Sequence, residues 1–242
     1  MKPLVLLHGW GLSSQIWSSL LPRLAGEVIA LDLPGHGATP AAHGPGLADW
    51  SDALVPKIPL GATLCGWSLG ALIALDLARR HPARVGRLIL LGATPRFVAE
   101  QGWPHGLAAP IVAGFQAGFA TDPVATLRRF VALQTLGDAR RRQVAAALSE
   151  ALPPSGGGDQ AALAAGLALL ADTDLRPGLG EIHQPVRLLH GQGDALMPVA
   201  AATWLADALP QARLTVLEDC GHAPFLSRPA DCATLMDGFR HD

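Results

Sequence analysis

Residues 62–70 read Ala-Thr-Leu-Cys-Gly-Trp-Ser-Leu-Gly, an apolar run that ends in a Gly-x-Ser-x-Gly pentapeptide. The run at 62–65 predicts a short buried strand, and the pattern at 69–80 predicts a helix that stops before Pro82. A serine on such a sharp strand-to-helix turn takes a strained backbone conformation, and only glycine fits two residues before and after it. We therefore predict that Ser68 is a catalytic nucleophile, held above a sheet at the N-terminus of a helix.

Short apolar runs bounded by Gly, Pro or Asp alternate with helical patterns, such as the one at 200–208, over most of the chain. Apolar strands separated by helices predict an α/β fold with a mostly parallel sheet covered on both faces. The chain begins at the first of these strands, so we expect about six strands, unless the reading frame starts further upstream. The expected strands are 4–7, 28–32, 62–65, 87–91, 186–190 and 213–217.

The alternation stops between about Arg96 and Ile182, where no strand is expected. This region instead contains helical patterns rich in Ala, Leu and Arg, at 110–119, 123–134, 139–151 and 159–171. A stretch of Pro and Gly at 153–158 predicts a loop between the last two. We therefore expect an α/β core at 1–96, an all-helical lid at 97–182, and the rest of the core at 183–242.

The charge balance and the cysteine count argue against several classes of protein. The 242 residues include 18 Lys and Arg and 20 Asp and Glu, and this net charge of −2 argues against general nucleic-acid binding. The cysteines Cys65, Cys220 and Cys232 suggest neither a disulfide framework nor a metal site, and Cys65 is expected to be a small buried residue. The nine histidines show no ligand spacing, so no metal or organic cofactor is expected.

The N-terminus shows no secretory signal, because the apolar run at 4–7 is too short and His8-Gly9-Trp10-Gly11 follows it at once. The other apolar stretches are broken well short of a membrane span. We therefore expect a cytoplasmic protein that does not bind membranes, and we expect it to be a monomer.

A serine hydroxyl needs a base to take its proton, and the base needs an acid to orient it. His222 is the candidate base, because it lies between the last expected strand and the last helix, in a loop at the carboxyl edge of the sheet. Asp194 is the candidate acid, because its loop follows the penultimate strand and the chain order becomes Ser, Asp, His. Asp219 is nearer to His222 in the sequence and remains the alternative.

The carbonyl oxygen of an ester gains negative charge during attack, and two N–H groups aimed at it would stabilise that charge. The candidate donors are the N–H of Leu69, directly after the serine, and the N–H of Trp10, in the loop after the first strand. His8 in the same loop, and His36 in the turn after the second strand, are expected to brace the backbone rather than to take part in the chemistry.

Five motifs together resemble the α/β-hydrolase superfamily, and they span almost the whole core. The resemblance implies a hydrolase in which Ser68, Asp194 and His222 form the triad and in which Trp10 and Leu69 form the oxyanion loop. The motifs are LLHGWG at 6–11, DLPGHG at 32–37, GWSLG at 66–70, HGQGD at 190–194 and GHAP at 221–224.

The helical region resembles, more specifically, the lid of the carboxylesterases that hydrolyse the methyl ester of pimeloyl-acyl carrier protein in biotin synthesis. The similarity lies in AGFQ at 113–116, RFVALQTLG at 129–137 and DTDLR at 172–176, and Trp10 and Trp67 fit it too. The resemblance implies release of methanol and of a free carboxylate on the carrier-bound chain. It also implies that substrate is bound by Trp10, Ser68, Leu69, Phe130, Val131, Ala132, Leu133, Gln134 and His222.

Arginines are concentrated in the lid, where Arg128, Arg129, Arg140, Arg141 and Arg142 have only Asp138 as an acid among them. Positive charge concentrated there, in a weakly acidic protein, could steer an acidic partner to the lid. By the resemblance, Arg129 and Arg142 are positions that meet the acidic carrier protein. A further basic position of the family holds Ala125 here, with Arg128 nearby as a substitute. Without the resemblance, a solvated helix face explains the same arginines.

Three other functions are compatible with these residues. A general short-acyl carboxylesterase or lactonase would use the same triad and ignore the lid arginines, and a thioesterase would attack the carrier linkage itself. A non-catalytic ligand-binding protein of this fold is disfavoured, because Ser68, Asp194 and His222 are all present. Dehalogenases and epoxide hydrolases of this fold need an acidic nucleophile, which Ser68 is not.

Overall fold

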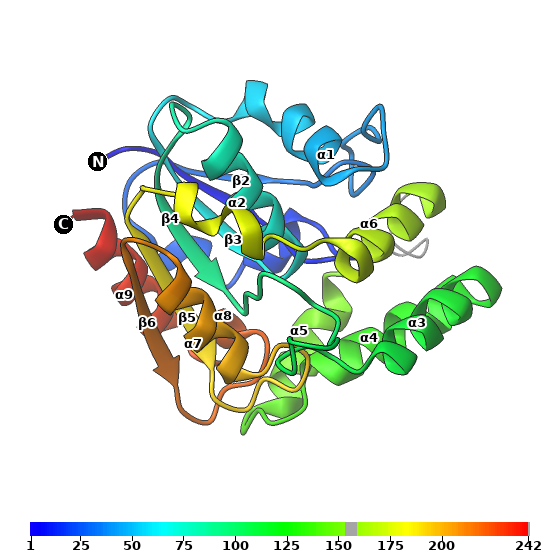
Figure 1. Cartoon of the computed structure of the whole chain (residues 1–242). Coiled ribbons are helices and arrows are strands. Elements are labelled where there is room, and N and C mark those ends of the chain that lie inside the picture. The colour runs from blue at the N-terminus through cyan, green and yellow to red at the C-terminus, as the bar shows by residue number, and fades with distance from the viewer. Residues whose placement is uncertain (153–158, 242) are drawn as a thin grey trace.

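Six parallel strands form one sheet at the centre of the protein, in the order β2-β1-β3-β4-β5-β6 (Figure 1). The computed structural model describes residues 1–152 and 159–241. Every expected strand is present, with its ends within two residues of their expected positions, so the α/β fold with a six-stranded sheet is confirmed. The strands are β1 (Leu4–Leu7), β2 (Val28–Leu31), β3 (Ala62–Trp67), β4 (Val85–Leu91), β5 (Val186–Gly191) and β6 (Ala212–Leu217).

Helices cover both faces of the sheet, because its strands alternate apolar side chains to either side. Leu64 and Leu88 belong to the apolar cluster on one face, and Cys65 and Ile89 belong to the cluster on the other. The first cluster is covered by α1 (Leu47–Leu54), α2 (Leu69–Arg80) and α7 (Val199–Ala208). The second is covered by the short 3-10 helix η1 (Ser14–Trp17), α8 (Pro224–Ser227) and α9 (Pro229–His241).

Between β4 and β5 the chain forms four helices, which we call the helical insertion: α3 (Ala109–Thr121), α4 (Pro123–Gln134), α5 (Arg141–Glu150) and α6 (Gln160–Asp172). Figure 1 shows the insertion on the side of the core away from both termini. Each helix lies within two residues of its expected bounds, and only isolated bridges occur in the described part of this stretch. The loop expected at 153–158 falls outside the described residues.

Local sequence explains where the insertion helices begin. The Asp122 carboxylate accepts a hydrogen bond from the Ala125 N–H at 3.0 Å and so caps α4, while Pro123 takes its first position. Asp159 caps α6 in the same way, through the N–H of Ala161 at 2.8 Å. Both caps follow from residue types that favour helix starts, which is why the sequence pattern locates these helices well.

Helix α1 is not predicted by the sequence pattern. Its eight residues are fewer than the window of about 11 to 18 over which helical periodicity stands out. The 3-10 helices η2 (Leu21–Arg23), η3 (Val55–Lys57) and η4 (Arg176–Glu181) are likewise too short to predict. These elements connect the strands without changing the order of the sheet.

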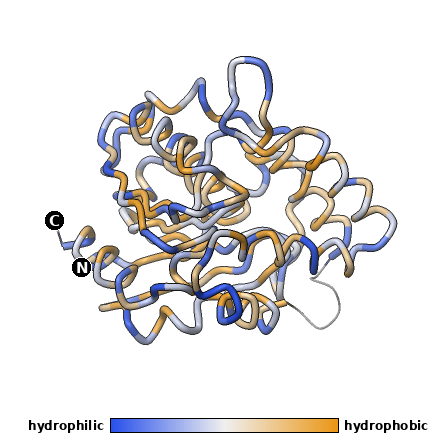
Figure 2. Tube along the Cα trace, turned by 90° about the horizontal axis from the view of Figure 1, so that it is seen from below, coloured by the Kyte–Doolittle hydropathy of each residue, from blue (hydrophilic) through white to orange (hydrophobic). Residues whose placement is uncertain are grey.

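The interior of the fold is apolar. Figure 2 shows hydrophobic segments concentrated inside the trace and hydrophilic stretches at several outer turns. All three cysteines are free and buried, so the expectation that Cys65 is a small core residue is confirmed. No helix within residues 1–152 and 159–241 has the length and the apolar character needed to cross a membrane.

Candidate active site

Ser68 lies on the turn between β3 and α2, at the carboxyl edge of the sheet. Its backbone has φ 57° and ψ −118°, outside the regions that L-residues ordinarily occupy. The Ser68 N–H donates to the Leu91 carbonyl at 3.1 Å, which ties the strained residue to the neighbouring strand β4. The sequence pattern therefore predicts both the position and the strain of this serine.

Two glycines make the turn sterically feasible. A Cβ added to Gly66 would collide with the backbone carbonyl of Gly70, and a Cβ added to Gly70 would collide with the carbonyls of Leu7 and His8. The first contact closes the turn, and the second lets α2 start directly against the end of β1. The spacing Gly-x-Ser-x-Gly is therefore required by backbone contacts.

His222 and Asp194 form a buried hydrogen-bonded pair at the same edge of the sheet. His222 Nδ1–H donates to Asp194 Oδ2 at 2.8 Å, and Asp194 Oδ1 accepts from the N–H groups of Leu196 and Met197, both at 2.9 Å. Burial alone would raise the pKa of Asp194, but His222 and the Met197 N–H hold that pKa below its usual range. The carboxylate is therefore charged and oriented toward the histidine.

Asp219, the alternative acid, is exposed, and its backbone carbonyl accepts a hydrogen bond from the Ala139 N–H at 3.0 Å. The loop of Asp194 has a further support that the sequence analysis did not find. Buried His190 donates from Nε2 to the Met197 carbonyl at 2.7 Å, and burial lowers the pKa of His190. The sequence signal that could have identified His190 is its position at the end of an expected buried strand, four residues before Asp194.

Two contacts place His222 beside Ser68. Trp67, the residue before Ser68, donates from Nε1 to the His222 backbone carbonyl at 2.9 Å, a role that the sequence analysis did not assign to it. Gly92, directly after the Leu91 that accepts from Ser68, lies against the imidazole, and a Cβ there would be 3.0 Å from Nδ1. His222 Nε2 is buried and makes no hydrogen bond with any described residue, Ser68 included, so this nitrogen is not committed to another group.

His8 and His36 brace the loop that carries Trp10, so their expected role is confirmed. The Leu33 N–H donates to His8 Nε2 at 3.0 Å, and the Gly11 N–H donates to His36 Nε2 at 3.2 Å. The other ring nitrogen of each histidine donates to a nearby backbone carbonyl. Both rings are therefore neutral, and burial lowers both pKa values, that of His8 to about 3.

The braced loop passes beside the serine. A Cβ added to Gly9 would lie 3.3 Å from Ser68 Cβ. The N–H groups of Trp10 and Leu69 find no backbone acceptor among the residues that the structure describes, so both can donate to a substrate oxygen. The Trp10 side chain is held by a hydrogen bond from Nε1 to the Leu163 carbonyl of α6, at 2.7 Å.

The helical insertion closes over this site. The ring of Phe130 in α4 packs edge-on against Trp10, with 5.0 Å between ring centres, and against Phe115 of α3 at 5.6 Å. Ser68 is 2% exposed and His222 is 0% exposed, so both are closed off from solvent in this structure. Of the lid residues expected to bind substrate, Phe130, Val131 and Gln134 are buried, Leu133 is half-buried and Ala132 is exposed.

The five insertion arginines are all exposed. No ion pair joins any of them to a carboxylate in the part of the chain that the structure describes. The guanidinium carbon of Arg129 lies 5.5 Å from the centre of the Phe115 ring, and Arg141 Nε donates to the Thr135 hydroxyl at 3.3 Å. Their positive charge is therefore not neutralised within the described chain.

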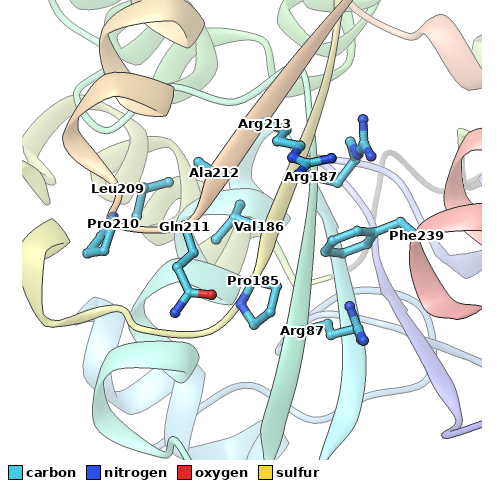
Figure 3. A pocket seen from close by; sticks show the side chains of 10 residues that line it. All are labelled: Arg87, Pro185, Val186, Arg187, Leu209, Pro210, Gln211, Ala212, Arg213 and Phe239. Carbon is cyan, nitrogen blue, oxygen red and sulfur yellow. The ribbon is translucent and has the colours of Figure 1, made fainter. Parts of the chain in front are cut away.

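A cavity of about 670 Å³ lies at the other edge of the sheet, at the amino ends of β5 and β6 (Figure 3). Arg87, Arg187 and Arg213 line it together with Phe239 of α9. Ser68, Asp194 and His222 follow the carboxyl ends of the strands, so this cavity lies at the opposite edge of the sheet from these three candidates. In the described residues, no group of three or more His, Cys, Asp or Glu side chains is arranged to hold a metal ion.

Residues 4–235 match the alpha/beta hydrolase family, and the chain belongs to that family, as its motifs predict. One relative is the pimeloyl-[acyl-carrier protein] methyl ester esterase of Aromatoleum aromaticum, 61% identical over 97% of this chain and 96% of the relative. The biotin biosynthesis bifunctional protein BioHC of Teredinibacter turnerae is 38% identical, over 98% of this chain and 44% of that protein. The solved structure of an esterase from Exiguobacterium antarcticum matches with a TM-score of 0.87 at 24% identity. The match covers 100% of this chain and 92% of the esterase chain, and it supports the fold alone.

Acid should destabilise the protein through His8. The pKa of His8 is about 3 in the folded protein and about 6.5 in an unfolded chain, so below about pH 6.5 the unfolded state binds a proton that the folded state excludes. The contribution of neutral His8 to the free energy of unfolding is therefore fully present above about pH 6.5 and decreases as the pH falls toward 3. At pH 5 the loss from His8 alone is about 2 kcal/mol. Urea denaturation at pH 7 and pH 5 measures this loss.

The matched variants are His8→Gln, which has an amide oxygen to accept from Leu33 but does not titrate, and His43→Gln, which alters an exposed histidine. His8→Gln should lose less stability than the wild type between pH 7 and pH 5, and His43→Gln should follow the wild type. The same loss in all three proteins would contradict a buried neutral His8.

Asp194→Asn should lower kcat for p-nitrophenyl acetate by about 10⁴-fold, because an amide neither stabilises the charged imidazole nor selects the right tautomer. Asp219→Asn is the matched control and should keep the wild-type kcat, since its carboxylate is exposed. Steady-state rates of the two variants decide between them. A loss in Asp219→Asn with full activity in Asp194→Asn would assign the acid to Asp219.

Proposed function

We propose that this protein is a serine carboxylesterase that hydrolyses the methyl ester of pimeloyl-acyl carrier protein in biotin synthesis. The products are methanol and pimeloyl-acyl carrier protein with a free carboxylate. The observation that carries the proposal is the likeness, over almost the whole chain, to an esterase named for that substrate. The Asp194–His222 hydrogen bond beside Ser68 supports hydrolysis by a serine at the same edge of the fold.

Ser68 is the nucleophile and His222 is the general base. The Ser68 oxygen attacks the methyl ester carbonyl while its proton passes to His222 Nε2, the ring nitrogen that is free. Asp194, buried and charged, stabilises the resulting imidazolium through the bond to Nδ1. His222 then gives the proton to the leaving methoxide, and methanol departs. Water, deprotonated by the same histidine, cleaves the acyl-enzyme and releases the carboxylate.

The negative charge of each tetrahedral intermediate falls on the former carbonyl oxygen. The N–H groups of Trp10 and Leu69 stabilise it, because they belong to the loop and the helix start that meet at Ser68. The bracing of the first loop by His8 and His36 holds the Trp10 donor in place before the substrate arrives. Removal of one such donor costs about 3–4 kcal/mol of transition-state stabilisation.

The segment 97–182 acts as a lid over the acyl chain. Phe130 lies against Trp10, and Val131 and Gln134 are buried on the same helix, which supports our assignment of this part of α4 to the acyl chain. Leu133 and Ala132 complete the stretch that we assign to substrate binding. The buried state of Ser68 supports a lid that opens for substrate, because an enclosed, dry site strengthens the electrostatic interactions within it.

The carrier protein docks on the arginines of the helical insertion. Arg128, Arg129 and Arg142 are exposed and, within the described chain, unpaired with carboxylates, so an acidic partner can approach them without first breaking an ion pair. Their helices, α4 and α5, belong to the lid. A carrier protein bound there presents its tethered chain close to the lid, which supports a carrier-bound ester over a small free ester.

A growth test decides the proposed function. The gene should restore growth without biotin to a bacterium that lacks its own pimeloyl ester esterase, and the Ser68→Ala gene should not. Removal of a triad nucleophile lowers kcat by about 10⁶-fold, so no useful activity remains. Failure of the wild-type gene, with the protein present and active on p-nitrophenyl acetate, would identify a general carboxylesterase instead.

The docking arginines should affect the carrier-bound ester alone. Changing Arg128, Arg129 and Arg142 to Ala should lower kcat/KM for the carrier-bound ester, chiefly through slower association. The loss should shrink at high salt, because the Debye length falls from about 10 Å at 0.1 M to about 3 Å at 1 M. The rate on p-nitrophenyl acetate should stay unchanged, because that ester has no carrier.

Two controls separate docking from packing. Arg129 contacts Phe115, so a variant that changes only Arg128 and Arg142 keeps this contact and should still lose activity on the carrier-bound ester. A variant with the exposed Arg23 and Arg213 changed to Ala, both outside the insertion, should behave like the wild type. Equal losses of activity on both substrates would mean that the arginines hold the lid together. No loss of activity on either substrate would mean that they form a solvent-exposed face without a binding role.

A further inference from the structure

The turn between α4 and α5 carries a buried carboxylate that the proposed mechanism does not use. Asp138 is 7% exposed, and its two oxygens accept three hydrogen bonds. Oδ2 accepts from the Gly221 N–H at 2.8 Å, and Oδ1 accepts from the Ser227 hydroxyl at 2.9 Å and from the Arg140 N–H at 2.7 Å. All three partners donate, so the position suits a side chain that only accepts.

Two of these partners lie on either side of the candidate base. Gly221 immediately precedes His222, and Ser227 ends the short helix α8 that follows it. The third bond, to Arg140, is local to the turn and is the kind that any Asp makes before a helix. A role in starting α5 therefore accounts for one bond, and the other two join the helical insertion to the loop of the base.

The same turn also contacts the loop of the candidate acid. Gly137 packs so closely on Gly193, the residue before Asp194, that a Cβ on Gly137 would collide with the Gly193 carbonyl. The Gly193 N–H donates in turn to the Cys220 carbonyl at 2.9 Å. The insertion turn, the acid loop and the base loop therefore meet at one junction.

We propose that Asp138 is a positioning residue for His222, through which the seated helical insertion sets the alignment of the base. This inference rests on the proposed function, because it assumes that His222 takes the serine proton. Glycine has the largest backbone freedom of any residue, so Gly221 leaves the base loop loosely defined unless another group holds it. The Asp138 carboxylate supplies that hold from the insertion, and Trp67 supplies a second one from the core.

Asp138→Ala should lower kcat for p-nitrophenyl acetate by about 10²-fold, the cost of a displacement of about 1 Å in a catalytic group. KM should stay the same, because this small ester does not touch the turn. Asp138→Asn keeps the volume and one acceptor oxygen, so it should fold and lose less. If thermal unfolding shows that Asp138→Ala does not fold, the same kcat measurement is made on Asp138→Asn.

Asp122→Ala is the matched control for damage to the insertion. Asp122 is an exposed aspartate whose carboxylate caps α4, but it makes no bond to the base loop among the described residues. It should lose helix stability, by thermal unfolding, and keep the wild-type kcat. A loss of kcat as large as that of Asp138→Ala would show that any weakening of the insertion disturbs the site, and it would overturn the specific role of Asp138.

The decisive measurement adds Asp138→Ala to His222→Ala. If Asp138 acts through His222, the double variant should have the same residual kcat as His222→Ala alone. A further 10²-fold loss in that background would show an action independent of the base and overturn the proposal. Wild-type kcat in Asp138→Ala, with His222→Ala inactive, would also overturn it and leave the triad intact. Full activity in His222→Ala would instead refute the proposed function itself.

Discussion

The strained backbone of Ser68 depends on the close approach of α2 to the ends of β1 and β3. Glycine at 66 and 70 permits this approach, since any larger residue at either place would meet a backbone carbonyl. The approach in turn fixes what surrounds the serine. β1 delivers the Trp10 loop on one side, and β4 delivers Gly92 on the other, because both are the sheet neighbours of β3.

The acid and the base come from the next two strands of the same sheet. Parallel strands end at one edge, so the loops after β5 and β6 bring Asp194 and His222 together although 28 positions separate them in the chain. The buried histidines differ in how many of their ring nitrogens are hydrogen-bonded. His8 and His36 have both ring nitrogens hydrogen-bonded to the backbone, whereas His222 Nε2 has no hydrogen-bond partner among the described residues.

The helical insertion does more than cover this site. Phe130 packs against Trp10 in the loop after β1, and the α4–α5 turn contacts the loops of Asp194 and His222 through Gly137 and Asp138. The loops of Trp10, Asp194 and His222 are therefore all contacted by the same set of helices and the turn between them. The exposed arginines of the insertion lie on these same helices, α4 and α5, and in the turn between them.

The sequence by itself determined the six strands and the four insertion helices to within two residues, the elbow at Ser68 and the bracing histidines, because these depend on local spacing and on short backbone turns. It favoured Asp194 over Asp219 as the acid because of strand order, although Asp219 is nearer to His222 in the chain. Only the tertiary structure placed Asp194 against His222, through strands that the sheet brings side by side. It also revealed the hydrogen bonds of Trp67, His190 and Asp138, whose partners lie up to 155 positions away. Such contacts carry no periodic signal, because a hydrogen bond between distant loops constrains two residues and leaves the pattern around them unchanged.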